Sequence, residues 1–170
     1  RHDACVYCEL CVDVCPVLRP TDQDLHEQIG LMEPVKDEGF GPYAYGVYAR
    51  ATDKAWADSG QDGGVCSALL IHGMRNGTLG GVVAGEEHAE NPQMGSSMLQ
   101  TTEAQILTGA RSRYTYQPNT LALVEAMQKN ITPLAVVGVP CQVDGVRQQQ
   151  HSSIRLDVAE WYRENISLVI

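Results

Sequence analysis

Four of the six cysteines in this chain lie close together near its amino end, at Cys5, Cys8, Cys11 and Cys15. The surrounding residues, 1–19, show no apolar periodicity that could build a hydrophobic core, so their fold must depend on what the thiols bind. Pro16 directly follows the last of the four cysteines and ends the run. We therefore expect residues 1–19 to form a small segment folded around a metal.

The spacing C-x2-C-x2-C-x3-C-P is that of bacterial ferredoxins, which bind 4Fe–4S clusters. Cys5, Cys8 and Cys11 lie on a tight loop and can hold one cubane. Cys15 either completes that cluster or serves a second one, as the fourth cysteine does in two-cluster ferredoxins. Zinc sites favour cysteine pairs with a longer spacer, and disulfides require an oxidising compartment. The pattern predicts an electron-transfer protein with at least one 4Fe–4S cluster.

The composition of the chain limits which partners and which cellular locations we expect. The chain has 170 residues and a formal net charge of −9, with 21 acidic residues against 12 basic ones. Nucleic-acid binding usually requires clustered basic residues, so we expect no nucleic-acid partner. No apolar run approaches the roughly 18 residues of a membrane span, and no secretory signal is present. We expect a cytoplasmic protein without a membrane span of its own, free or peripheral to a membrane complex.

The rest of the chain is predicted to form a linker followed by one larger domain. Prolines and glycines at 20–45 predict a linker with one short helix at 23–32. Alternating patterns over 46–170 predict an α/β (α+β) domain with a mixed sheet. Strands are expected at 47–51, 82–84, 98–99, 134–137 and 167–170, and helices at 65–76, 102–107, 119–130, 142–150 and 154–163, with Gly77 ending the first helix and Thr102 and Asn119 as caps. Because the last predicted strand runs to the final residue, we expect a fragment whose missing flanks matter.

Three segments of this domain have compositions suited to a ligand. Residues 61–65 form a glycine turn before a helix, where free N–H groups suit a phosphate, although a plain tight turn is the commoner explanation of such glycines. Residues 109–114 combine small residues with two arginines, and they form either an anion site or a solvated loop. Cys141 follows the carboxyl end of a buried strand, where open α/β sheets bind ligands, but such a cysteine is as often structural.

Together these segments resemble the beta subunit of coenzyme F420-reducing hydrogenase and F420-dependent formate dehydrogenase. The likeness rests on residues 49–53, 61–70, 81–85, 113–119 and 138–147, in that order, and covers about residues 46–170, the amino-terminal part of the family's catalytic domain. The ferredoxin-like segment placed ahead of this domain resembles the electron-input subunits of F420-oxidising membrane complexes and the flavin half of F420-dependent sulfite reductase.

The resemblance implies one FAD, a nearby 4Fe–4S cluster, coenzyme F420 as the hydride substrate and other redox subunits as partners. It implies that Asp62, Gly63, Gly64 and Ser67 border the flavin, that Arg113, Tyr114 and Asn119 reach its phosphate or ribityl portion, and that Cys141 is a cluster ligand whose partner cysteines lie beyond residue 170. Cys66 and His72 are expected to pack in the core. No side chain is expected to act as a general base.

The predicted function is therefore electron transfer between coenzyme F420 and 4Fe–4S clusters by way of FAD. One alternative is a ferredoxin-type relay subunit without flavin chemistry, in which the α/β part only docks partners. Another is a scaffold stabilised by zinc.

Overall fold

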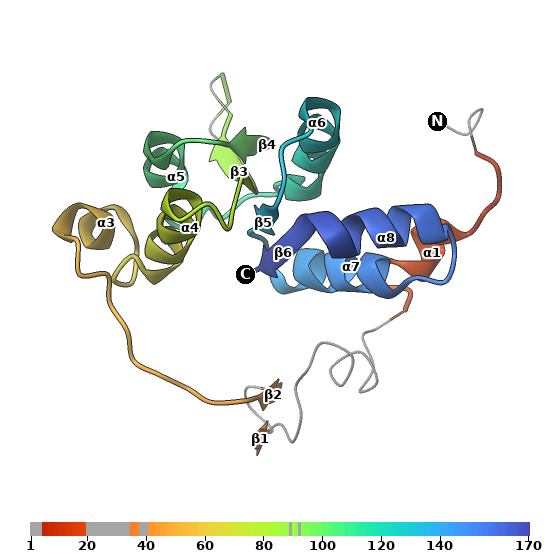
Figure 1. Ribbon diagram of the computed structural model, residues 1–170, viewed down its shortest axis with the longest axis horizontal. Helices are drawn as coiled ribbons and strands as arrows, with labels where there is room; N and C mark the ends of the chain where they lie inside the picture. Colours follow the sequence, from red (N-terminus) through yellow and green to blue (C-terminus); the bar gives the residue numbers. More distant parts are fainter. Residues whose placement is uncertain (1–4, 20–34, 38–40, 89, 92) are drawn as a thin grey trace. The chain divides into compact units, whose positions relative to one another are not determined.

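A computed structural model describes residues 5–19, 35–37, 41–88, 90–91 and 93–170. The chain divides into two compact units (Figure 1). The first unit comprises Arg1–Tyr48 and Asp144–Tyr162, and the second comprises Ala49–Val143 and Arg163–Ile170. The helix expected at 23–32 lies outside the described residues, and the boundaries 1–19, 20–45 and 46–170 stay a prediction.

The second unit contains the predicted mixed sheet. Its strand order is β4 (Gly95–Gln100), β3 (Gly81–Glu87), β5 (Leu134–Val136) and β6 (Ile166–Val169). β3 pairs antiparallel with β4 and parallel with β5, and β5 pairs parallel with β6. The mixed α/β class is thus confirmed, and the strands expected at 82–84 and 98–99 are longer than predicted.

Strand β3 forms the centre of the core. Residues 81–85 are all buried because β3 has a neighbour on each edge and helices on both faces. Val82 and Ala84 pack with residues of α4 (Val65–Arg75) and α5 (Glu103–Gly109). Helix α6 (Ala122–Lys129) also contacts β3 and β4. Figure 1 shows α4 and α5 on one side of β3 and β4, and α6 on the other.

Helix α4 starts at a turn that only glycine fits. Gly64 has φ +69°, and a Cβ there would lie 2.1 Å from the carbonyl oxygen of Trp56. At the other end Gly77, φ +78°, follows the C-cap residue Asn76, as predicted.

Helix α4 buries one face in the core of the second unit. Ser67, Leu70 and Ile71 are buried, whereas Leu69 and His72 are exposed. The expectation that His72 packs in the core was wrong. The apolar run at 68–71 supports more than one helical stripe, so periodicity alone did not select the face.

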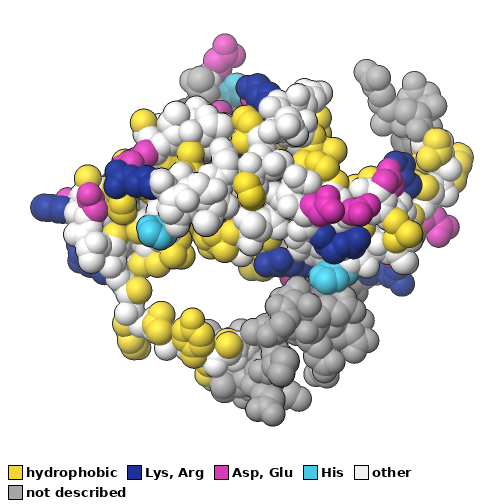
Figure 2. Space-filling view, in the orientation of Figure 1, with side chains coloured by type: hydrophobic (Ala, Val, Ile, Leu, Met, Phe, Trp, Pro, Cys, Tyr) yellow, Lys and Arg dark blue, Asp and Glu magenta, His cyan; other side chains and the backbone are white. Residues whose placement is uncertain are grey.

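The strand expected at 47–51 is absent, and this stretch of described residues has no regular structure. Val47 and Tyr48 are exposed, and Ala51 N–H donates to the carbonyl of Gly63. Figure 2 shows apolar side chains exposed along the segment that leads to α3 (Lys54–Ser59). The β-forming residues here have no neighbouring strand with which to pair.

Two features around the helices were not predicted. Helix α3 begins at Asp53, whose carboxylate accepts from the N–H groups of Ala55 and Trp56. Asn119 does not cap a helix: it opens the short 3-10 helix η2 (Asn119–Leu121) that precedes α6, and its amide donates to the carbonyl of Val137 at 2.9 Å. Asn119 thus bonds to the loop that follows β5 instead of capping a helix.

The first unit contains the hairpin of β1 (Val35–Asp37) and β2 (Gly41–Tyr43) and the short helix α1 (Leu10–Asp13). It also contains most of α7 (Pro140–His151) and α8 (Leu156–Asn165), the two helices predicted at 142–150 and 154–163. The Gln150 amide donates to the Tyr162 carbonyl at 3.1 Å and ties α7 to α8. None of the helices in the described ranges combines the length and apolarity needed to cross a bilayer.

Thr102 caps helix α5, as its sequence predicted, and the structure shows that the cap is a full capping box. The Thr102 hydroxyl accepts from Gln105 N–H at 3.3 Å, and the Gln105 side chain accepts from Thr102 N–H at 3.1 Å. In the first turn, Glu103 accepts from the Trp56 indole and pairs with Arg75, which joins α5 to α3 and α4. The start of α5 is thus fixed both locally and by its neighbours.

We expect Thr102→Ala to lower the free energy of unfolding by about 1 kcal/mol, because the Gln105 N–H in the first turn loses its hydroxyl acceptor. Thr108→Ala is the matched control, since Thr108 lies exposed in the same helix and alanine favours helix. Urea unfolding followed by circular dichroism measures both. Equal stability of the two variants would contradict the capping role.

Candidate functional site

The second unit contains a cavity of about 340 Å³ near the carboxyl ends of β3 and β5. Its wall is formed by Ala84 and Gly85 of β3, residues 137–139 after β5, the first turns of α4 and residues 109–113 after α5. This is the position where open α/β sheets bind ligands, because loops diverge there.

Three of the seven residues predicted to contact a flavin line this cavity together: Ser67, Arg113 and Asn119. Gly63 and Gly64 form the turn before α4, and Asp62 is exposed on the same turn; none of the three is in the cavity wall. Tyr114 is exposed and lines, with Arg113, a different hollow of about 410 Å³ beside Glu87 and Met94. The roles of all seven residues stay predictions.

Two buried amide side chains present unpaired atoms at the cavity. Gln100 is 2% exposed and Asn119 is 7% exposed. Among the described residues neither Gln100 Nε2 nor Asn119 Oδ1 has a hydrogen-bond partner. The bond from Asn119 Nδ2 to the Val137 carbonyl fixes which end of this amide is free. An unpaired buried polar atom costs about 1–3 kcal/mol, so these atoms fit a polar ligand.

The two arginines of the cavity wall are bonded to backbone carbonyls. Arg113 donates to the carbonyls of Gly109 at 2.7 Å and Thr108 at 3.3 Å, at the negative end of the α5 dipole. Arg111, with φ +81°, donates to the carbonyls of Ser59 and Asp58 at the carboxyl end of α3. These bonds hold the loop 109–113 in place, so much of the arginines' donor capacity serves structure.

Cys66 packs against the core, as expected, and also lines the cavity. Burial raises the pKa of its thiol, because the thiolate would be poorly solvated there. Cys66 is therefore an apolar wall residue at neutral pH.

In the first unit the cysteine segment is largely exposed. Cys5, Cys8 and Cys11 are exposed free thiols and Cys15 is partly buried. The backbone turns through left-handed residues at Tyr7 and Glu9, between successive cysteines, and Tyr7 N–H donates to Cys5 Sγ at 3.5 Å. Across the described residues, no three acidic, cysteine or histidine side chains are gathered closely enough to hold a metal ion. A set of only thiols, with an N–H to sulfur bond, suits the chemistry of an iron–sulfur cluster.

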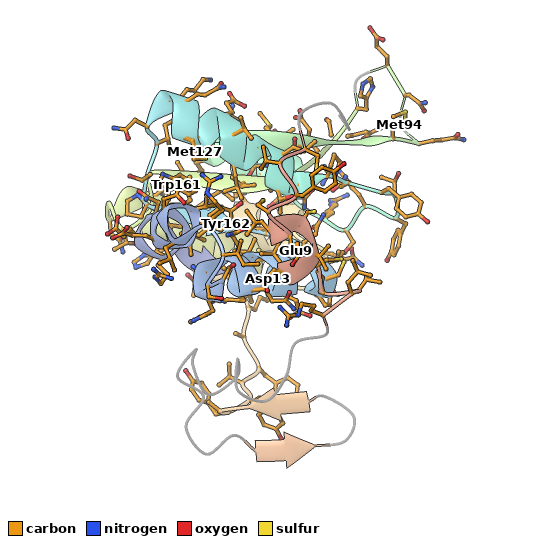
Figure 3. The ribbon with its side chains drawn as sticks, turned by 90° about the vertical axis from the view of Figure 1, so that its right-hand side faces the viewer. Glu9, Asp13, Met94, Met127, Trp161 and Tyr162 are labelled. Atoms are coloured by element: carbon orange, nitrogen blue, oxygen red, sulfur yellow. The ribbon has the colours of Figure 1, made fainter. Side chains whose placement is uncertain are left out.

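Residues of α7 anchor the cysteine segment within the first unit. Ser152 Oγ, just after α7, lies 2.7 Å from Asp13 Oδ2, and Gln148 Nε2 donates to the Arg19 carbonyl at 2.6 Å. Asp13 also pairs with Arg19. Figure 3 shows Asp13 on α1 beside these helices. The chain between Cys11 and Cys15 is thus held by residues far away in sequence.

Cys141 is exposed in the first turn of α7 and belongs to the second unit. Its predicted role as a cluster ligand stays a prediction. Sequence reasoning missed Gln100, Ser152 and Gln148; a glutamine at the end of an apolar strand was the signal available for Gln100.

Comparison with protein families gives two matches. Residues 46–124 match the family described as coenzyme F420 hydrogenase/dehydrogenase, beta subunit N-term, and residues 1–18 match the 4Fe-4S binding domain. The fold and the cysteine segment thus define an iron–sulfur protein with an α/β domain. The chain belongs to the family of coenzyme F420 hydrogenase and dehydrogenase beta subunits, as its sequence motifs predicted.

The chain is similar to several known proteins. It is 32% identical over 136 residues to the coenzyme F420 hydrogenase subunit beta of Methanococcus voltae, covering 75% of this chain and 48% of that protein. It is 30% identical over 176 residues to one of the subunits of the F420H2 dehydrogenase of Methanosarcina mazei, covering 86% and 49%. The chain spans less than half the length of these relatives.

A structural relative comes from the F420-reducing [NiFe] hydrogenase complex of Methanosarcina barkeri. The TM-score is 0.68 at 28% sequence identity, and the match covers 79% of this chain and 45% of that one. Over the matched part, a chain of that complex therefore has a similar fold.

We expect Ser152→Ala to loosen the cysteine segment, because Asp13 loses a hydrogen bond to its carboxylate. A bond to a charged group contributes about 1.5–3 kcal/mol, so amide exchange in the segment 9–19 should quicken roughly tenfold. Ser153→Ala is the matched control, since Ser153 is exposed where Ser152 is buried. Hydrogen–deuterium exchange by mass spectrometry measures this, and identical protection in both variants would refute the anchor.

Proposed function

We propose that this chain is part of an oxidoreductase and passes electrons between coenzyme F420 and 4Fe–4S clusters by way of FAD. The observation that carries the proposal is the cavity at the carboxyl ends of β3 and β5, with two unpaired buried amide atoms, inside the domain that contains the family match. The similarity to hydrogenase beta subunits and to an F420H2 dehydrogenase supports the choice of substrate.

The residues of the cavity fit a flavin. Ser67 and Asn119 present polar atoms to it, and Leu70, Ile106 and Val137 supply apolar wall that excludes water. No side chain of the described residues caps the first N–H groups of α4, an eleven-residue helix whose amino end suits a phosphate. FAD, when bound, supplies the exchange between a hydride pair and single electrons.

The cysteine segment supplies the one-electron side of the proposed reaction. Cys5, Cys8 and Cys11 would hold a 4Fe–4S cluster, and Cys15 would complete it or serve another. Cys141 would bind a further cluster with ligands from other residues. The chain's own groups bind and orient; no side chain need act as a general base. The proposed partners are other redox subunits, in the cytoplasm or at the surface of a membrane complex.

We expect the chain, purified without oxygen and supplied with FAD, iron and sulfide, to retain about one FAD and to oxidise reduced F420 with a viologen dye as acceptor. Flavin absorbance and dye reduction measure the two properties. A protein that carries clusters but retains no flavin would instead be a ferredoxin-type relay. A protein with both groups that leaves reduced F420 unoxidised would contradict the choice of F420 as donor.

We expect Cys11→Ala to lose the iron and sulfide of the amino-terminal cluster, because a thiolate ligand is removed. Cys66→Ala is the matched control: it also removes a thiol, but one that packs against the core. Iron and acid-labile sulfide analysis, with electron paramagnetic resonance of the reduced protein, measures the difference. Zinc in place of iron in the parent protein would overturn the cluster assignment.

A further inference from the structure

We infer that Gln100 is a specificity-determining residue of the cavity, which with Asn119 recognises the uncharged, imide-bearing edge of a flavin ring. An imide carries carbonyl oxygens beside an N–H, so it offers acceptors to one amide and a donor to the other. This inference rests on the proposed function and names which part of the ligand the buried amides contact.

The backbone position of Gln100 places its side chain in the interior. It is the last residue of β4 and pairs with Val82 at the buried centre of the sheet. A Cβ on Gly109 would lie 2.2 Å from Gln100 Nε2, so the glycine at the end of α5 leaves room for this amide. The interior thus has room for the long polar side chain of Gln100. A smaller apolar side chain at this position would leave no polar atom unpaired.

Within the part of the chain that the structure describes, Gln100 Nε2 has no hydrogen-bond partner. Gln105, the amide at the start of α5, accepts instead from the N–H groups of Thr101 and Thr102. Leaving two buried amides unpaired in one cavity costs about 1–3 kcal/mol for each, which a ligand with complementary groups would recover.

The charges around the cavity favour a neutral ligand group at these two residues. No aspartate, glutamate, lysine or histidine is among the described residues of the cavity wall, and Arg111 and Arg113 donate to backbone carbonyls. The free atom of Asn119 is an acceptor, Oδ1, which would repel the oxygens of a phosphate. The free atom of Gln100 is a donor, so the pair requires a group with both an acceptor and a donor.

The apolar wall completes the match to a ring. Leu70 and Ile106 are buried beside the cavity, from α4 and α5, and Val137 follows β5. A planar heteroaromatic ring presents apolar faces and a polar edge. The cavity likewise combines an apolar wall with two polar amide groups. We therefore assign the ring to the region of Gln100 and Asn119, and the phosphates to a position away from Asn119 Oδ1.

The test compares Gln100→Leu with Gln128→Leu, the same substitution at an exposed position of α6. Quenching of FAD fluorescence gives the dissociation constant, and Raman spectroscopy of the bound flavin gives its carbonyl stretching frequencies. We expect Gln100→Leu to weaken FAD binding roughly tenfold, the equivalent of one hydrogen bond of about 1.4 kcal/mol, and to raise a carbonyl frequency. Gln128→Leu should change neither.

Two outcomes would refute the inference, and a second variant covers the case in which Gln100→Leu does not fold. If FAD binds and Gln100→Leu alters neither affinity nor carbonyl frequency, the role of Gln100 is refuted while the proposed function stands. If the unmodified protein binds no FAD, both are refuted. If circular dichroism shows that Gln100→Leu does not fold, Gln100→Glu, of the same size, is measured instead; it replaces the donor by a carboxylate and should show the same loss.

Discussion

Burial of strand β3 on both faces and both edges is the constraint on which the second unit depends. Residues 81–85 have no exposed side, so α4 and α5 must cover one face of the sheet and α6 the other. Helices placed in this way leave the carboxyl ends of β3 and β5 as the place where loops separate, and the cavity lies there. The position of the candidate site therefore follows from core packing.

The groups around this cavity are of two kinds, those that bond to the backbone and those that keep a polar atom unpaired. Arg111 and Arg113 hold the loop 109–113 through backbone carbonyls, and Gln142 bridges the Gln117 carbonyl and the Val139 N–H. Gln100 and Asn119 keep atoms unpaired in the interior. A rigid rim with a few unpaired neutral groups inside favours selection by hydrogen-bond pattern, because the rim does not adjust to an ill-fitting ligand.

The sequence predicted what depends on local chemistry. The cysteine spacing, the Thr102 cap of α5 and the apolar strand β5 are each defined within a few residues, and the structure or the family match agrees with them. Features that depend on distant residues were missed or wrong. The buried face of α4 is chosen by the sheet, the extended stretch 47–51 lacks a strand partner, and Asn119 bonds to Val137 instead of capping a helix. Gln100 gained significance only once its amide proved to be unpaired.

Residues far from it in sequence anchor the cysteine segment. Ser152, just beyond α7, bonds to Asp13, and Gln148, in the carboxyl-terminal part of α7, bonds to the Arg19 carbonyl. Cys141 lies in the first turn of the same helix. A disturbed carboxyl-terminal turn of α7 would therefore loosen the support of the amino-terminal cysteines even with residues 9–19 unchanged.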